Sequence, residues 1–193
     1  MNCVNDRVYP FAESKGKDRD NEKDSCCIPK FSRPKKILLE CGSNPQDAIF
    51  EIDDDVEDDQ TFVLDSVIVD TTCLYRPLVK IEFSSIVYFE AEAEDGNESE
   101  IKVDLLFELI RTCKGEKECI QSWRYIKGYE VGNGQELEIE VSEPFTVTFC
   151  DKVCPDCCEY KMIVKGKDFE GDFDALRVVK PDISALAQGL CND

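Results

Sequence analysis

Cysteine is the residue type of this chain whose spacing could do chemistry. The 193 residues include 12 cysteines and no histidine. A dense group with one CxxC spacing comprises Cys150, Cys154, Cys157 and Cys158. The others are spread along the chain, and they are Cys3, Cys26, Cys27, Cys41, Cys73, Cys113, Cys119 and Cys191. Thiols can form disulfides, bind metal or exchange electrons, and all twelve are candidates for disulfide cross-linking.

Three chemistries are open to the dense group. We favour structural disulfides at a corner between strands, with metal binding as the alternative, because four thiolates can hold zinc or an iron–sulfur cluster. The specific zinc pattern has two CxxC knuckles, however, and this chain has one, with Cys113 and Cys119 as loose partners. A thioredoxin-like redox site fits least, because it needs a strand-to-helix turn in an α/β fold.

Two pairs of adjacent cysteines, Cys26–Cys27 and Cys157–Cys158, have a geometric consequence. Neighbouring side chains of an extended chain point to opposite sides, so the members of a pair face different partners. Three cysteines lie in residues 1–35 and nine in the remainder. Because nine is odd, complete oxidation requires a bridge from the remainder to residues 1–35 or to another molecule. The alternative is that some thiols stay free.

The charge balance and the missing histidine argue against several functions. The chain has 42 Asp and Glu against 23 Lys and Arg, a net charge of −19, which disfavours binding to nucleic acid or to an anionic membrane. Without imidazole, Ser-His-Asp and Cys-His catalysis and histidine-containing zinc sites are excluded. No nucleophile–base pair stands out, and the sequence predicts neither an enzyme nor a cofactor.

Two acidic runs, Glu51–Asp59 and Glu90–Glu100, are predicted to be solvated surface. The first lacks the glycine and the glutamate that an EF-hand loop requires, so weak calcium binding is the minor alternative.

The sequence also predicts the compartment. The N-terminal region has no apolar h-region of a secretory signal, and no stretch approaches the roughly 18 apolar residues of a membrane span. We therefore expect a protein made in the cytoplasm without a signal peptide. Because cytoplasmic proteins rarely keep disulfides, the thiols either bind metal or oxidise after the producing cell has lysed.

Residues 1–35 are predicted to form a flexible N-terminal arm, and residues 36–193 a β-sandwich domain. The segment Ser14–Ser25 is charged and has no apolar residue, as in a linker. Residues 1–36 hold nine Lys and Arg against six Asp and Glu, a net charge of +3, whereas residues 37–193 carry −22. An extended arm of this length spans roughly 115 Å at ~3.3 Å per residue.

The domain shows the alternation of apolar and polar residues that is typical of β-strands. Strands are expected at Ile37–Cys41, Phe62–Val69, Ile81–Phe89, Ile101–Leu109, Ser122–Glu130, Leu137–Val141, Phe145–Phe149, Glu159–Val164 and Ala175–Val179. Turn residues separate them at Gly42–Pro45, Asp95–Asn97, Lys114–Glu116, Gly132–Gly134 and Gly166–Asp168. Only Ile183–Leu190 has helical character.

This pattern predicts an all-β protein, an antiparallel two-sheet sandwich of about eight to ten strands that is jelly-roll-like. Its core is expected to hold Trp123, Phe83, Phe89, Phe107, Phe145 and Phe149.

Several segments together resemble a family of uncharacterised proteins from clostridial spore-forming bacteria. They are Arg33–Gly42 (RPKKILLECG), Asp70–Cys73 (DTTC), Lys80–Val87 (KIEFSSIV), Phe107–Cys113, Phe145–Cys158 with the CPDCCEY motif, and Ala185–Gln188. The resemblance covers roughly residues 33–190. It implies a fold and a taxon, because the family has no activity that we can name.

The layout is also similar to that of bacterial endospore appendage subunits, in which an arm with a Cys-Cys pair precedes a cysteine-bearing jelly roll. In those fibres the arm, or N-terminal connector, of one subunit docks on others and is locked by disulfides. The resemblance implies that Cys26 and Cys27 are the arm pair, although this arm is longer and has the additional Cys3. Spore-surface proteins can be made in the mother cell and oxidise on its lysis, which accounts for the absent signal peptide.

Our leading hypothesis is a self-assembling structural protein, a subunit of a spore-associated fibre or surface layer. Its partners would be copies of itself or close paralogues, with no nucleic acid and no membrane. Arm docking, strand addition at sheet edges and intermolecular disulfides would join the subunits. The alternative is a cytoplasmic metal-binding module that uses Cys150, Cys154, Cys157 and Cys158.

Overall fold

Nine β-strands account for most of the residues that the computed structural model describes, which are 35–51, 60–93, 100–130, 132 and 136–191. In chain order they are β1 (Lys35–Cys41), β2 (Ala48–Phe50), β3 (Thr61–Asp70), β4 (Leu74–Ala93), β5 (Glu100–Cys113), β6 (Glu116–Glu130), β7 (Leu137–Lys152), β8 (Cys157–Glu170) and β9 (Asp172–Cys191). Residues 1–34 of the predicted arm lie outside the described residues, and Lys35, which the prediction gave to the arm, is the first residue of β1. Within them, no helix is long and apolar enough to cross a membrane.

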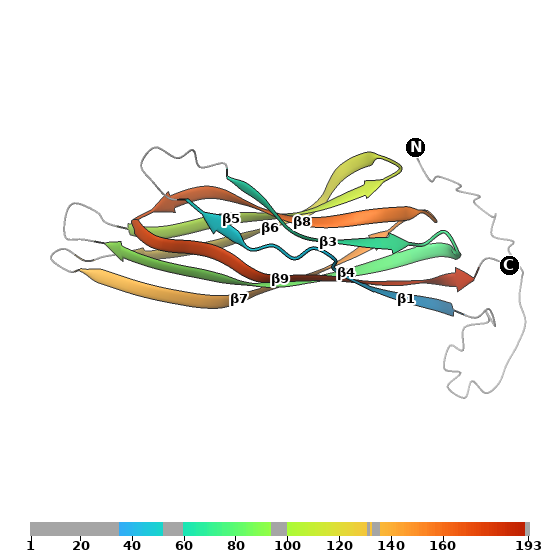
Figure 1. Cartoon of the computed structure of the whole chain (residues 1–193), viewed down its shortest axis with the longest axis horizontal. Helices are drawn as coiled ribbons and strands as arrows, with labels where there is room; N and C mark the ends of the chain where they lie inside the picture. Colours follow the sequence, from blue (N-terminus) through green and yellow to red (C-terminus); the bar gives the residue numbers. More distant parts are fainter. Residues whose placement is uncertain (1–34, 52–59, 94–99, 131, 133–135, 192–193) are drawn as a thin grey trace, which may run out of the picture. The chain divides into compact units, whose positions relative to one another are not determined.

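The strands form two antiparallel sheets that lie face to face (Figure 1). Sheet A has the order β1-β9-β4-β7, with β2 also paired to β9, and sheet B has the order β3-β8-β5-β6. The chain thus passes repeatedly from one sheet to the other, and the two strand orders are those of a jelly roll. The fold class predicted from the sequence is confirmed.

The core lies between the sheets and is built by alternate residues of each strand. The predicted aromatic residues of the central strands, Phe83, Phe89 and Phe107, are buried, whereas those of the edge strands β6 and β7 are half-buried; the latter are Trp123, Phe145 and Phe149. Phe107 of sheet B stacks on Phe145 of sheet A with ring centroids 4.0 Å apart. The aromatic cluster therefore extends to the β7 edge of the sandwich.

The tail that the sequence predicted to be helical is part of β9, so that expectation is wrong. Ala, Leu and Gln favour helices, yet Ile183, Ala185 and Ala187 are buried at every second position. The segment lies between β1 and β4 and is paired with both. Two neighbouring strands and a period of two override its intrinsic helix propensity.

Two further expectations are wrong. Leu137–Val141 and Phe145–Phe149 form one strand, β7, which continues through Pro144 because an edge strand tolerates a missing N–H. The turn predicted at Gly166–Asp168 lies inside β8, where a β-bulge places Gly166 opposite Leu105. The chain passes into β9 at Gly171 instead, with a φ of 106° that suits glycine. The sequence pattern also failed to predict the short strand β2.

Candidate functional site: a cysteine-rich end of the sandwich

Most cysteines of the sandwich gather at one of its ends, which is on the right in Figure 1 and which we call the cysteine end. Strand ends and connecting loops at this end contain Cys73, Cys113, Cys154, Cys157, Cys158 and Cys191. The register brings them together, because Cys113 pairs with Cys158, Asp70 with Cys157, and Leu74 with Cys191. β1 begins here as well, since Lys35 pairs with Leu190. The chain that follows residue 34 therefore enters the sandwich at the cysteine end.

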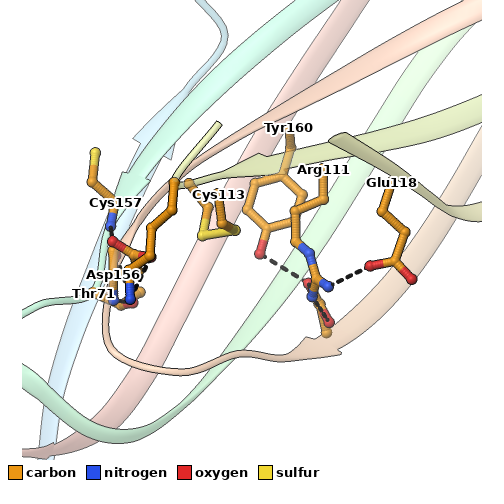
Figure 2. The surroundings of a disulfide bond; sticks show 10 residues. Thr71, Arg111, Cys113, Glu118, Asp156, Cys157 and Tyr160 are labelled. Atoms are coloured by element: carbon orange, nitrogen blue, oxygen red, sulfur yellow. Dashed lines mark hydrogen bonds and ion pairs between the residues drawn. A yellow bond between two sulfur atoms is a disulfide. The ribbon is translucent and has the colours of Figure 1, made fainter. Parts of the chain in front are cut away.

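One disulfide links neighbouring strands of sheet B at the cysteine end (Figure 2). Cys113, the last residue of β5, is bonded to Cys158 of β8, and their Cα atoms are 4.5 Å apart. Cys158 is buried, whereas the adjacent Cys157 is exposed. The sequence-based prediction that these two neighbours face opposite sides is confirmed.

Hydrogen bonds fix the loop that leads from β7 to β8 (Figure 2). The backbone N–H and the hydroxyl of Thr71 donate to the carbonyl oxygen of Asp156 at 2.7 and 2.9 Å. The Asp156 carboxylate accepts from the Cys157 N–H at 2.9 Å and lies 3.5 Å from Lys114 Nζ. Lys114 and Gly115 have φ values of 52° and 81° and form the predicted β5–β6 hairpin turn. The loop is thus tied to both neighbouring connections.

Beside the disulfide, an ion pair joins the two sheets. Asp151 of β7 accepts hydrogen bonds from Arg111 of β5 at 3.0 and 2.8 Å and from the Tyr160 hydroxyl of β8 at 3.0 Å. Glu118 of β6 accepts from the second terminal nitrogen of Arg111 at 2.8 Å. Burial, followed by the negative charge of Asp151, raises the pKa of Tyr160 far above its ordinary value, so the hydroxyl remains a donor. No spacing in the sequence predicts this contact.

Five thiols are free and exposed in the part of the chain that the structure describes: Cys41, Cys73, Cys119, Cys150 and Cys157. Cys73 Sγ accepts a hydrogen bond from Lys36 Nζ at 3.1 Å. Cys154 is not among the free thiols. The remaining candidates, Cys3, Cys26 and Cys27, lie outside the described residues, and Cys191 is placed only by its backbone at the end of β9.

An apolar patch covers the outer face of sheet A near the cysteine end, between Cys41 on β1 and Cys150 on β7. This outer patch consists of Ile37, Leu39, Tyr75, Leu78 and Leu186, which are 40–68% exposed. Leu39 pairs with Leu186 across β1 and β9, and Ile37 and Leu78 lie on either side of the exposed Gln188, which pairs with both. The outer face of a sandwich is normally polar, and contiguous exposed apolar side chains mark an interaction surface.

The structure does not assemble the ligand set of the metal alternative. Cys158 is bonded to Cys113, and Cys150 lies on the outer face of sheet A opposite Lys80. Among the described residues, no group of three or more potential ligands could hold a metal ion. Four acidic residues line a hollow of about 390 Å³ at the other end of the sandwich, namely Glu90, Glu138, Glu140 and Asp174. They do not form such a group either. The centres of the two acidic runs lie outside the described residues.

Cys119 should react most slowly among the free thiols. Burial, followed by the charge of Glu108, raises the pKa of its thiol, and the thiolate is the reactive form. At neutral pH we expect iodoacetamide to alkylate Cys119 about threefold or more slowly than Cys150 or Cys157, as followed by peptide mass spectrometry. Glu108→Gln should lower the pKa of Cys119 and bring its alkylation rate closer to those of Cys150 and Cys157. Equal rates at the three sites in the unmodified protein would contradict the prediction.

A search of curated proteins finds no relative of this chain. Among solved structures, similar chains come from infectious bursal disease virus: the Gx strain at 12% identity and a TM-score of 0.36, and the Gt strain at 11% and 0.36. The VP2 subviral particle of that virus is 10% identical with a TM-score of 0.27. The matches cover 89%, 90% and 89% of this chain, but only 38%, 43% and 42% of the viral chains.

One family model matches residues 35–188, and its description is "Domain of unknown function (DUF4489)". The match begins with the first residue of β1 and ends within β9, so it includes nearly the whole sandwich. It also agrees in extent with the uncharacterised family that the sequence motifs indicated. The chain therefore belongs to the DUF4489 family.

Proposed function

We propose that this protein is a self-assembling structural subunit, and not an enzyme, of a spore-associated fibre or surface layer in clostridial spore-forming bacteria. Copies of the chain or close paralogues are its partners, and the spore surface is its location after lysis of the mother cell. The observation that carries the proposal is the cysteine end. The exposed free thiols of Cys73 and Cys157 lie there, the outer patch with Cys41 and Cys150 at its sides lies nearby, and a 34-residue segment with three further cysteines precedes β1, which begins there.

The chemistry of cross-linking follows from the exposure of these thiols. In the reducing cytoplasm they stay reduced, and after lysis each pair loses two electrons and two protons to dissolved oxygen as a disulfide forms. Cys26 and Cys27 would supply one side of such bonds, and exposed thiols such as Cys41, Cys73 and Cys150 the other. Disulfides between copies would turn a reversible assembly into a covalent one.

The rigidity of the cysteine end favours this role. The Cys113–Cys158 disulfide and the bonds between Thr71 and Asp156 hold its loops in place. Pre-organised groups lose less conformational entropy when they bind a partner. Electrostatic attraction between residues 1–36 (+3) and residues 37–193 (−22) would steer the arm toward a neighbour, and salt would weaken this attraction.

Non-reducing electrophoresis of the full chain tests the proposal. Protein purified in reductant and then exposed to air should give a ladder of covalent oligomers that collapses to one band with dithiothreitol. Negative-stain micrographs of the oxidised protein should show fibres or sheets. The double variant Cys26→Ser/Cys27→Ser should lose most of the ladder, whereas Cys119→Ser should keep it. A single monomer band, or a ladder unchanged in the double variant, would overturn covalent assembly through the arm.

A further inference from the structure

The free edge of β7 is self-complementary in sequence. Phe145–Phe149 is Phe-Thr-Val-Thr-Phe, which is the same in both directions, and Pro144–Cys150 contains no charged residue. β7 is the last strand of sheet A and is paired with β4 on one side. On its other side, no strand from the described ranges is paired with it. An uncharged, unpaired edge strand is a template for the addition of another strand.

The other edges of the sandwich are protected in ways that are common in β-proteins. β3 accepts backbone hydrogen bonds from Ser43 and Gln46, at 3.1 and 2.7 Å, along its outer side. β1 and β2 are short, with seven and three residues. β6 has the charged side chains of Arg124 and Lys127 in its second half. Segment 144–150 of β7 is therefore the edge best suited to pairing.

We infer that two copies of the chain pair through this segment, antiparallel, about a two-fold axis that passes through Val147. In this register Val147 faces the partner's Val147, Thr146 faces the partner's Thr148, and Phe145 faces the partner's Phe149. A two-fold interface brings the same surface of both copies together, and because of the palindrome each residue from Phe145 to Phe149 then faces a residue of its own type. This inference rests on the proposed function, because it states which strands pair when one subunit adds to another.

The backbone of β7 is suited to this pairing. In an antiparallel ladder, alternate residues turn their N–H and C=O groups to opposite sides. Pro144 has no N–H and belongs on the side that faces away from β4, together with Thr146, Thr148 and Cys150. Thr146 and the partner's Thr148 would therefore exchange two backbone hydrogen bonds, and the symmetry repeats this pair. Only Pro144, at the end of the segment, has no N–H to donate to the partner strand.

The side chains of the segment also match. Thr146 and Thr148 are exposed on the outer face, where opposite threonines form favourable cross-strand pairs. Phe145, Val147 and Phe149 are half-buried at the margin of the core, and a partner strand would cover their open side. Pairing thus buries apolar surface that the isolated chain exposes at this edge.

Acidic residues flank the uncharged segment on both sides and make the association depend on salt. Beyond the palindrome, Glu143 would face the partner's Asp151, but each acid already has its own cation at 2.8 Å, Lys127 and Arg111 respectively. The remaining repulsion comes from the net charge of residues 37–193 and is screened by salt. Dimerisation should therefore strengthen as the ionic strength rises.

An engineered cysteine on the axis tests the register. Paired residues that are not hydrogen-bonded to each other have Cα atoms about 4.5 Å apart, within disulfide range. Val147→Cys in the full-length chain, with Cys150 replaced by serine, should oxidise to a dimer with a 147–147 linkage in the peptide map. Val141→Cys, with the same residue type, strand and face, is the matched control, since its mate lies far along the partner strand. No 147–147 linkage, or an equal yield of a 141–141 linkage, would overturn the inference.

Charge at the edge tests the association itself. In dithiothreitol, sedimentation of the full-length chain should show a monomer–dimer equilibrium that salt shifts toward the dimer. Thr146→Lys/Thr148→Lys should raise Kd about tenfold or more, because it places lysines opposite each other twice. Ser122→Lys, an added exposed lysine on the edge strand of the other sheet, should leave Kd unchanged. A reduced wild type that stays monomeric, or equal dimerisation of the double variant, would overturn the inference.

The two proposals fail separately. Dimerisation through β7 is measured in dithiothreitol, where no disulfide joins the copies. A monomer in that experiment would therefore leave the covalent ladder of the air-oxidised protein unaffected. Conversely, a missing ladder in air would not affect dimerisation in dithiothreitol. Circular dichroism of the lysine variants establishes that they remain folded.

Discussion

Replacing Asp65 with alanine should destabilise the sandwich by about 3–5 kcal/mol. The side chain is only 1% exposed and accepts hydrogen bonds from three backbone N–H groups. These donors belong to Asn44, Ser66 and Ile183, at 3.1, 2.7 and 3.2 Å. Because Asp65 is on β3 and Ile183 on β9, its carboxylate joins the two sheets. Alanine would leave these donors without their acceptor, at about 1–3 kcal/mol for each one that stays buried.

Urea unfolding, followed by the fluorescence of Trp123, the single tryptophan, measures this effect. Asp182→Ala removes an exposed carboxylate from the same part of β9 and should change the free energy of unfolding by less than about 0.5 kcal/mol. Asp65→Asn keeps one oxygen acceptor and should give an intermediate loss, which preserves the test if the alanine variant does not fold. A loss below about 1 kcal/mol for Asp65→Ala would show that water replaces the carboxylate.

Asp65 also illustrates what the sequence could predict and what it could not. Alternation correctly predicted a strand over Phe62–Val69, but a β-bulge between Val63 and Asp65 turns this acid inward. Gly42 lies in the predicted turn after β1, and a Cβ at this position would collide with Asp65 Oδ2. Position 42 therefore requires glycine, because the Asp65 carboxylate lies where a side chain would begin. Bulges shift the faces of a strand by one residue, and local patterns do not reveal them.

The cysteine end shows the same division. Adjacency alone predicted that Cys157 and Cys158 face opposite sides, because that property is local. The bond between Cys113 and Cys158 spans 45 residues and depends on the register of β5 against β8. Arg111, Asp151 and Tyr160 meet across two sheets, which no spacing along one strand encodes. Local physics thus determined the fold class and the strands, while the site depends on strand pairing.

Asp151→Ala should cost about 2–3 kcal/mol, less than the roughly 3–5 kcal/mol of a fully buried ion pair that loses one partner. The Arg111 side chain keeps 23% exposure and retains Glu118, so it is not left entirely unpaired, whereas the buried Tyr160 hydroxyl loses its acceptor. Glu118→Gln, which removes only the exposed partner of Arg111, should cost less than about 1 kcal/mol. Urea unfolding under oxidising conditions, with the Cys113–Cys158 bond intact, measures both variants.

The same substitution should loosen the cysteine end. Arg111 lies two residues from Cys113, Tyr160 two residues from Cys158, and Asp151 adjoins Cys150. Without the ion pair, local opening should expose the Cys113–Cys158 bond, and low concentrations of dithiothreitol should reduce it about tenfold or more faster than in the wild type. Glu118→Gln should keep a near-wild-type rate. If Asp151→Ala lowers stability but leaves the reduction rate unchanged, the bonds between Thr71 and Asp156 hold this end on their own. Faster reduction of the Cys113–Cys158 bond would mean that the ion pair between the sheets also keeps the loops of the cysteine end in place.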